Sequence, residues 1–256
     1  MLRSFWIAVS MYSKLPAPRV EWEKRSLSWA LCFFPAVGIA VGLLLRLWLE
    51  LSLLLGLGTE LRAAVALLIP VAVSGGIHLD GFCDTADALG SLQPREKKLE
   101  ILKDSHTGAF AIIACSFYLI FFFSAWCQIE TVPRHFWVLA IGPVLSRSLS
   151  GLAAVSWPNA RGSGLLAVFT QPMDASRARL VMVLWGLLSC TGMLALDPLT
   201  GGASILAAGL VFLYYRSMST RQFGGITGDL AGFFLQVCEC AMVFAVAMVQ
   251  SAGRLL

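Results

Sequence analysis

The sequence predicts an all-α, polytopic membrane protein, and three observations support that fold class. Charged residues make up 13% of the 256-residue chain, whereas a soluble domain usually carries about 25%. Mean hydropathy is +0.78. The apolar runs are continuous rather than alternating, and several approach the roughly 20 residues that a helix needs to cross a bilayer. Because lipid cannot hydrogen-bond the backbone, these runs favour transmembrane helices.

Seven segments approach this length, so we expect a transmembrane bundle of about seven helices. The sixth segment is short, and the apolar run 51–57 is a candidate re-entrant piece, so a count of six to eight stays open. No linker or low-complexity stretch divides the chain, and 1–256 is therefore treated as a single integral membrane domain. The predicted spans are 26–48, 61–77, 108–127, 136–157, 180–196, 203–215 and 231–249.

The distribution of basic residues predicts a cytoplasmic N-terminus. In that orientation 14 of the 19 Lys and Arg residues lie on the inner side, 4 lie on the outer side, and Arg147 lies within a span. The polar interval 78–106 becomes a charged cytoplasmic loop, and three shorter polar intervals share its side. A net charge of +4 on these loops suits lipid headgroups or phosphate ligands and gives no reason to propose nucleic acid.

Three carboxylates follow the second predicted span at helical spacing. Asp80, Asp84 and Asp87 are related as i, i+4 and i+7, which places them on one helix face with neighbouring Cβ atoms about 5–6 Å apart. Such like charges repel, and Mg²⁺, which prefers oxygen ligands, would compensate them. A solvated acidic surface helix is the alternative. The absence of interleaved lysines and the adjoining membrane helix favour the metal.

Other polar residues near the predicted spans suit phosphate handling. Lys103, Asp104, Ser105 and His106 precede the third span, where an ordinary helix cap is the alternative interpretation. His78 and His106 are candidates for a general base or for a hydrogen-bond donor to phosphate; the alternative is that they are structural histidines.

Arginines add candidate cations at the inner side and within the bundle. An unpaired charge at the position of Arg147 would cost at least about 2.5 kcal/mol. We expect Arg147 to pair with a carboxylate such as Glu239, to bind a ligand or to snorkel. Arg161, in the turn 161–164, and Arg221 supply further cations on the inner side.

Two short stretches of the sequence are alike. Residues 75–80 read Gly-Gly-Ile-His-Leu-Asp, and residues 224–229 read Gly-Gly-Ile-Thr-Gly-Asp. Each follows an even-numbered predicted span. The pattern predicts two tight glycine turns that present Asp80 and Asp229 to one site.

Several of these strings resemble the cobalamin synthase family, also called adenosylcobinamide-GDP ribazoletransferase. The string His-Leu-Asp-Gly-Phe-Cys-Asp-Thr-Ala-Asp-Ala-Leu at 78–89 is similar to the family signature, with Cys83 and Ala88 at positions where small residues, commonly Ala and Gly, are expected. Further blocks that fit lie at 15–18, 34–38, 103–108 and 224–229, so the resemblance covers most of the chain.

The resemblance implies a Mg²⁺-dependent late step of adenosylcobalamin synthesis at the bacterial inner membrane, with the active site facing the cytoplasm. Adenosylcobinamide-GDP and α-ribazole, or its 5′-phosphate, would give adenosylcobalamin, or its 5′-phosphate, and GMP. Asp80, Asp84 and Asp87 would hold the metal, and Asp104 or Asp229 would add a ligand or accept a proton. The implied substrate-binding residues are His78, Lys103, Ser105, His106, Arg147, Arg161, Arg221 and Thr227.

Rival functions share the aspartate-rich membrane surface. A CDP-alcohol phosphotransferase would need an Ala-Arg element that this chain lacks, and a prenyltransferase would carry a second aspartate-rich motif, whereas Asp229 stands almost alone. A small-molecule transporter would use Arg147 and Glu239 as a charge pair, but most polar residues gather on one side. Oligomeric state and association with other enzymes of the cobalamin pathway stay open.

Overall fold

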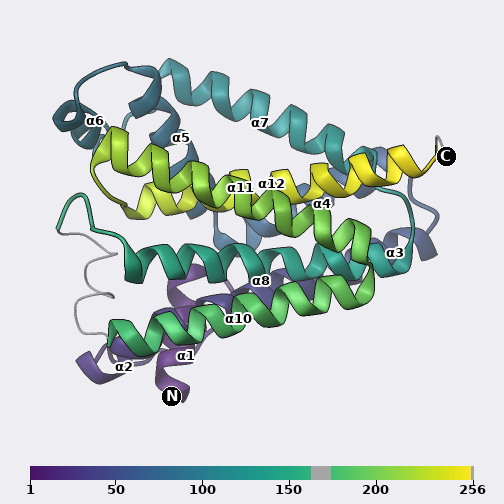
Figure 1. Cartoon of the computed structure of the whole chain (residues 1–256), viewed down its shortest axis with the longest axis horizontal. Helices are drawn as coiled ribbons and strands as arrows, with labels where there is room; N and C mark the ends of the chain where they lie inside the picture. The colour runs from purple at the N-terminus through teal and green to yellow at the C-terminus, as the bar shows by residue number, and fades with distance from the viewer. Residues whose placement is uncertain (163–173, 255–256) are drawn as a thin grey trace.

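The computed structural model describes residues 1–162 and 174–254, and this part of the chain is a bundle of helices with one isolated parallel bridge between Asn159 and Ile226 (Figure 1). The predicted all-α fold class is therefore confirmed. The helices are α1 (Leu2–Tyr12), α2 (Lys24–Ala30), the 3₁₀ turn η1 (Leu31–Phe33), α3 (Phe34–Leu54), α4 (Thr59–Ser74), α5 (Ile77–Gly90), α6 (Arg95–Ile101), α7 (Ala109–Cys127), α8 (Pro133–Ser156), α10 (Ala175–Leu196), α11 (Pro198–Phe223) and α12 (Gly228–Gly253).

Six spans in the described ranges are long and apolar enough to cross a membrane, and a seventh is counted if the pair α4–α5 is one broken span. The six are 26–54, α7, α8, α10, α11 and α12. The two helices of the pair meet at an angle of 94°. This count lies within the range of six to eight expected from the sequence, and it makes the chain a multi-pass membrane protein.

Three sequence expectations about individual spans were wrong. The second span does not continue straight to residue 77, because α4 ends at Ser74 and the chain turns sharply into α5. The run 51–57 is not a re-entrant piece, since α3 continues to Leu54. The sixth span is not short: α11 has 26 residues, because its polar last turns extend the helix past the apolar window.

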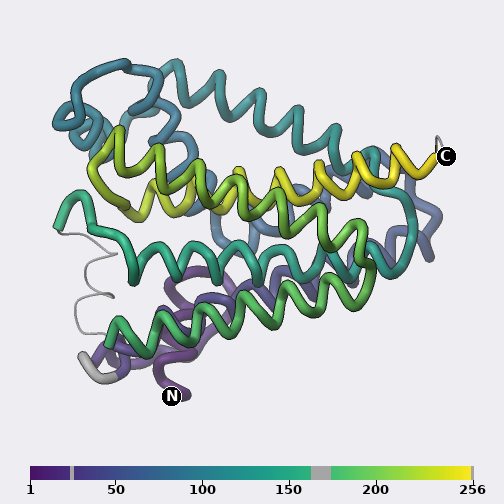
Figure 2. The backbone as a smooth tube through the Cα atoms, in the orientation of Figure 1, coloured from purple at the N-terminus to yellow at the C-terminus, as the bar shows by residue number. Residues whose placement is uncertain are grey.

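The polar connections lie together at one end of the bundle. In Figures 1 and 2, α6, the start of α7, the end of α8 and the turn between α11 and α12 lie at the left, whereas the α3–α4 and α10–α11 connections lie at the right. We call these the polar end and the opposite end. The interval expected as a charged loop, 78–106, is largely helical, since it contains α5 and α6. The chain alternates between the two ends if α4 and α5 together form one crossing.

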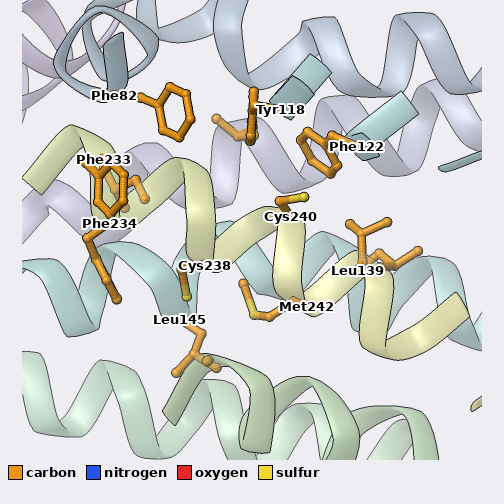
Figure 3. Packing of buried hydrophobic residues seen from close by; sticks show 14 of the residues in the cluster. Phe82, Tyr118, Phe122, Leu139, Leu145, Phe233, Phe234, Cys238, Cys240 and Met242 are labelled. Carbon is orange, nitrogen blue, oxygen red and sulfur yellow. The ribbon is translucent and has the colours of Figure 1, made fainter. Parts of the chain in front are cut away.

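The helix α12 lies in the middle of the core. Its side chains pack with those of α5 and α7, as Figure 3 shows. The rings of Phe82 and Phe233 are stacked with centroids 5.4 Å apart, and Phe82 lies 4.9 Å from Tyr118. These contacts fix the short helix α5 against two spanning helices. All seven cysteines are free, and Cys32, Cys238 and Cys240 are buried.

Candidate functional site

Two matching glycine turns place an aspartate at the start of α5 and of α12. Gly75 ends α4 with φ of 65°, and Gly224 ends α11 with φ of 74°, a left-handed conformation that glycine adopts without strain. Asp80 then lies in the first turn of α5, and Asp229 lies in the first turn of α12. The predicted pair of glycine turns is confirmed.

The two helices that carry these aspartates cross with their backbones in contact. A Cβ atom added to Gly81 would lie 2.7 Å from the carbonyl oxygen of Asp229, and one added to Gly232 would lie 2.9 Å from that of His78. Real Cβ atoms do not approach other atoms so closely. The crossing therefore brings the first turns of α5 and α12, and their carboxylates, to one place.

A cluster of carboxylates forms around this crossing. Asp84, half-buried one turn after Asp80, interacts electrostatically with Asp80, Asp229 and Asp87. Among the described residues, Arg161 is the cation that acts on the Asp84 carboxyl, and its Nη2 atom lies 3.0 Å from Asp229 Oδ2. We call Asp80, Asp84 and Asp229 the acidic cluster. Three acids beside one arginine leave negative charge for a ligand to neutralise.

The segment after α8 holds Arg161 in place. Ala160 N–H donates to Ile226 O at 2.9 Å, and Ile226 N–H donates to Pro158 O at 2.9 Å. Asn159 Oδ1 accepts from the N–H of Arg161 at 2.9 Å. This bridge ties the end of α8 to the turn before α12. Of the predicted turn 161–164, residues 163 and 164 lie outside the described residues.

Asp87 has a structural partner for each carboxylate oxygen. Its Oδ2 accepts from the N–H of Gly108 at 2.6 Å, and its Oδ1 accepts from that of Ala111 at 2.8 Å. The side chain thus caps α7 from a neighbouring helix. Each oxygen keeps a free lone pair, so the metal role of Asp87 stays a prediction. In residues 1–162 and 174–254, no three His, Cys, Asp or Glu side chains form a ready metal site.

A cavity of about 260 Å³ opens beside the acidic cluster. Asp80, Asp229 and Arg161 line it, as do residues of α1, α3, α8 and α12. Thr227 also lines it; its hydroxyl caps α12 by accepting from the N–H of Leu230 at 3.2 Å. His78 lines the cavity and is 8% exposed. Five of the predicted site residues therefore line this cavity: His78, Asp80, Arg161, Thr227 and Asp229. Asp84 lies beside them but does not line the cavity.

The residues predicted at 103–106 do not line this cavity. Lys103, Asp104, Ser105 and His106 are exposed in the connection between α6 and α7. Asp104 Oδ1 accepts from the backbone N–H of His106 at 3.0 Å and lies 2.7 Å from its Nδ1. These hydrogen bonds from His106 hold the pKa of the Asp104 carboxyl below its usual value. Arg221 is also exposed, in the last turn of α11.

Arg147 forms the buried ion pair that the sequence suggested. Its Nη1 atom lies 2.7 Å from Glu239 Oε1 and also donates to Pro143 O at 3.0 Å. Ser146 donates to the same Glu239 oxygen at 2.8 Å. The guanidinium lies 5.7 Å from the centre of the Phe34 ring, which lines the cavity. Arg147 itself does not line the cavity, and its substrate role stays a prediction.

Sequence reasoning missed several residues around the site. Tyr12 and Phe34 line the cavity, with ring centroids 4.3 Å apart. The side chain of Lys14 lies against Gly75, and the guanidinium of Arg95 lies against Gly224, so each glycine turn is covered by a basic residue. Lys14 is 61 positions from Gly75 in the sequence, and Arg95 is 129 positions from Gly224, so no local pattern links them to these turns. Phe34 opens one of the blocks that resemble the family.

The fold and the site together define a class: a multi-pass helical membrane protein with a carboxylate cluster at the polar end of its bundle. Comparison with known proteins narrows this class. The family model described as cobalamin-5-phosphate synthase matches residues 4–247. The chain belongs to that family, as its motifs predicted, and is thereby a transferase of cobalamin biosynthesis rather than a prenyltransferase, a CDP-alcohol phosphotransferase or a transporter.

Relatives named adenosylcobinamide-GDP ribazoletransferase are similar along nearly their whole length. One from Lachnoclostridium phytofermentans is 43% identical over 249 residues, covering 97% of this chain and 95% of the relative. One from Pseudomonas fluorescens is 35% identical over 251 residues, covering 95% and 98%. One from Clostridium botulinum is 28% identical over 248 residues, covering 97% and 98%. No solved structure matches the chain.

Proposed function

We propose that this chain joins adenosylcobinamide-GDP to α-ribazole, or to its 5′-phosphate, in a Mg²⁺-dependent reaction. The products are adenosylcobalamin, or its 5′-phosphate, and GMP. The observation that carries the proposal is the acidic cluster with Arg161 at the mouth of a cavity. Family membership and the name shared by the similar proteins support the choice of substrates.

The residues of the acidic cluster suit Mg²⁺ by the chemistry of their donors. Asp80 and Asp84 offer oxygen ligands one helical turn apart, with Asp229 across the helix crossing. Mg²⁺ usually takes one or two protein carboxylates and fills its other positions with water and substrate phosphate, so three converging side chains are not required. When bound, the metal would supply positive charge against the diphosphate.

The reaction is a displacement at phosphorus. An acceptor hydroxyl attacks the phosphorus next to cobinamide, a new P–O bond forms, and the P–O bond to GMP breaks. The proton of the hydroxyl passes to a carboxylate of the acidic cluster, for which Asp229 is placed at the cavity mouth. Arg161 neutralises charge on the transferred group. Positioning and electrostatics supply most of the rate enhancement in such transfers.

The exposed polar residues at the same end have room to meet the nucleotide part of the donor. Lys103 and Arg221 are accessible cations, and Ser105 and His106 are accessible hydrogen-bonding groups. We place this end in the cytoplasm of a bacterium, at its inner membrane, because 14 of the 19 basic residues belong to it in the predicted topology.

The test is GMP release from adenosylcobinamide-GDP and α-ribazole by protein in liposomes, with and without Mg²⁺. Asp84→Ala should lower turnover by about 10³-fold or more, as loss of a metal or proton-transfer ligand does. Glu96→Gln, an exposed acid on α6, is the matched control and should keep wild-type turnover. Metal-independent release, or wild-type turnover in Asp84→Ala, would contradict the assignment of the acidic cluster.

A further inference from the structure

The cavity beside the acidic cluster changes from polar to apolar with depth. α12 runs away from the polar end, and Leu235 lies six residues after Asp229, about 9 Å deeper at the helical rise. α8 approaches the polar end, so Ser150 lies one turn deeper than Ala154 on the facing wall. Leu31, which is buried, adds to the apolar part. The cavity therefore has an acidic mouth and a largely apolar interior.

Aromatic rings form part of this interior. Phe34 lies 4.3 Å from the Tyr12 ring and 6.0 Å from the His78 ring, which it meets edge to face. The Arg147–Glu239 pair supports Phe34, because the guanidinium lies 5.7 Å from its ring centre. Flat aromatic walls of this kind favour a flat ligand.

Four buried polar atoms of residues that line the cavity lack a hydrogen-bond partner among the described residues. Three belong to Asn159 and Arg161 near the acidic cluster, and the fourth is Nε2 of His78 on α5. His78 is 8% exposed, and its Nε2 atom has no hydrogen-bond partner within the described residues. Nearly all buried polar atoms in folded proteins are hydrogen-bonded, so a buried atom without a partner calls for a ligand atom. A single ring nitrogen or hydroxyl of a bound molecule would satisfy it.

The size and lining of the cavity indicate which part of the two substrates can bind in it. At about 260 Å³, it is smaller than the roughly 300–1,000 Å³ of sites that hold a whole drug-sized ligand, so a corrinoid cannot enter. Guanine, with several polar groups on its edges, would lose hydrogen bonds against the apolar interior. The base of α-ribazole is a dimethylated benzimidazole, which has an apolar edge and one unsubstituted ring nitrogen.

We propose that this cavity is the acceptor subsite and holds the benzimidazole base of ribazole, with its methyl groups towards Ser150 and Leu235. The inference rests on the proposed function and deepens it. With the base inside, the attached ribose lies at the mouth, beside Asp80 and Asp229. The acceptor therefore binds from the bundle interior, and the diphosphate of the donor meets it from the polar end.

The experiment fills the deep part of the cavity and compares two acceptors. Ser150→Leu adds volume to the cavity wall, and Ala154→Leu does so one turn nearer the mouth. Ser116→Leu makes the same change at an exposed position of α7 and is the control. KM and kcat are measured by GMP release in liposomes for α-ribazole and for the riboside of unsubstituted benzimidazole, with the KM of adenosylcobinamide-GDP as a third readout.

The proposal makes a specific prediction for each readout. Wild-type protein should favour α-ribazole over the unmethylated riboside by about tenfold in kcat/KM, from the burial of two methyl groups. Ser150→Leu should raise the KM of α-ribazole at least tenfold, raise that of the smaller acceptor less, and leave the donor KM unchanged. Ala154→Leu should change the KM values of the two acceptors in the same direction as Ser150→Leu does. This variant keeps the test informative if Ser150→Leu fails to fold. Ser116→Leu should match wild type.

Two outcomes would overturn the subsite. One is an unchanged preference between the acceptors in folded, active Ser150→Leu and Ala154→Leu. The other is a rise in the donor KM without a rise in the acceptor KM, which would assign the cavity to the donor. Neither resembles failure of the proposed function, in which wild-type protein of proven integrity releases no GMP.

Discussion

The two ends of the bundle both carry carboxylates, but they neutralise them differently. At the opposite end Asp197 caps α11 through the N–H groups of Leu199 and Thr200 and lies 3.1 Å from Arg134 Nε. At the polar end three acids of the acidic cluster share Arg161.

The opposite end is also joined across helices. His135 Nε2 lies 3.4 Å from Asp197 Oδ2, and its Nδ1 lies 2.6 Å from Gln250 Nε2, so α8, α11 and α12 meet in one network. Glu130 accepts from Arg254 at 3.0 Å. Acids whose charge is fully balanced by cations and hydrogen bonds (matched acids) stabilise the fold, whereas acids that retain excess negative charge are suited to binding a ligand. If this contrast holds, substitutions of matched acids should lower stability, whereas substitution of an acid in the acidic cluster should not.

The largest loss of stability should come from breaking the buried Arg147–Glu239 ion pair, which lies between the two ends. Arg147→Met leaves Glu239 buried without its cation, which should cost about 3–5 kcal/mol of stability. Denaturant titration in detergent micelles measures it. The double variant Arg147→Met, Glu239→Gln should regain much of the loss, because no charge is left unpaired. Equal stability of the single and double variants would show that the two residues do not act as a pair.

Asp87 should be the most costly carboxylate at the polar end. Asp87→Asn weakens the cap of α7 at Gly108 and Ala111, and we expect about 1–2 kcal/mol lower stability. Activity should fall as well, because the connection that carries Lys103 to His106 loses its anchor. Full activity at unchanged stability would contradict the capping role. The midpoint of denaturation and GMP release are measured on the same preparation.

Asp197→Ala should cost about 1 kcal/mol, the typical value of a helix cap, with turnover retained. Burial alone would raise the pKa of Asp197, but hydrogen bonds from Thr200 and the nearby His135 outweigh it and hold that pKa below its usual value. Its stabilising contribution is thus complete above the unfolded pKa of about 3.9 and is lost as pH falls through the folded pKa. Titrating stability from pH 6 to pH 3 should give a shallower decline in Asp197→Asn than in wild type.

The smallest expected change in stability is a gain rather than a loss. Asp84→Asn removes one of the mutually repelling charges of the acidic cluster, so without metal the protein should gain a few tenths of a kcal/mol, as relief of a like-charge pair does. Turnover should be lost at the same time. Destabilisation of 1 kcal/mol or more would place Asp84 among the matched, structural acids instead. Asp197→Asn, measured in parallel, serves as the reference for a matched acid.

Much of this fold follows from the sequence, because long apolar runs and the demand for hydrogen-bonded backbone leave few alternatives. The 94° bend between α4 and α5 could not be predicted from the sequence. Gly75 and Gly76 predicted a turn, but a turn alone does not say that the next helix folds back into the bundle. That outcome depends on the packing of Phe82 against Phe233 and Tyr118, residues 36 or more positions away in sequence.

The arrangement of the candidate site was predictable where it depends on local spacing and unpredictable where it depends on packing. Helical spacing identified Asp80 and Asp84, and the repeated glycine pattern identified Asp229. The same spacing grouped Asp87 with them, because it cannot reveal that the N-terminus of α7 lies against that carboxylate. Asn159 was missed altogether, since its role arises from a bridge to Ile226 across the fold.

The backbone contact at the crossing of α5 and α12 also determines which mutations the site tolerates. At Gly81 and Gly232 even a methyl group would collide with main-chain atoms of the other helix, and main-chain atoms cannot rotate away as a side chain can. Replacement by alanine would wedge the helices apart and move Asp80 from Asp229 without altering either acid. In a saturation-mutagenesis screen for activity, these two glycines should therefore be as intolerant as the acids themselves, although neither has a functional group to lose.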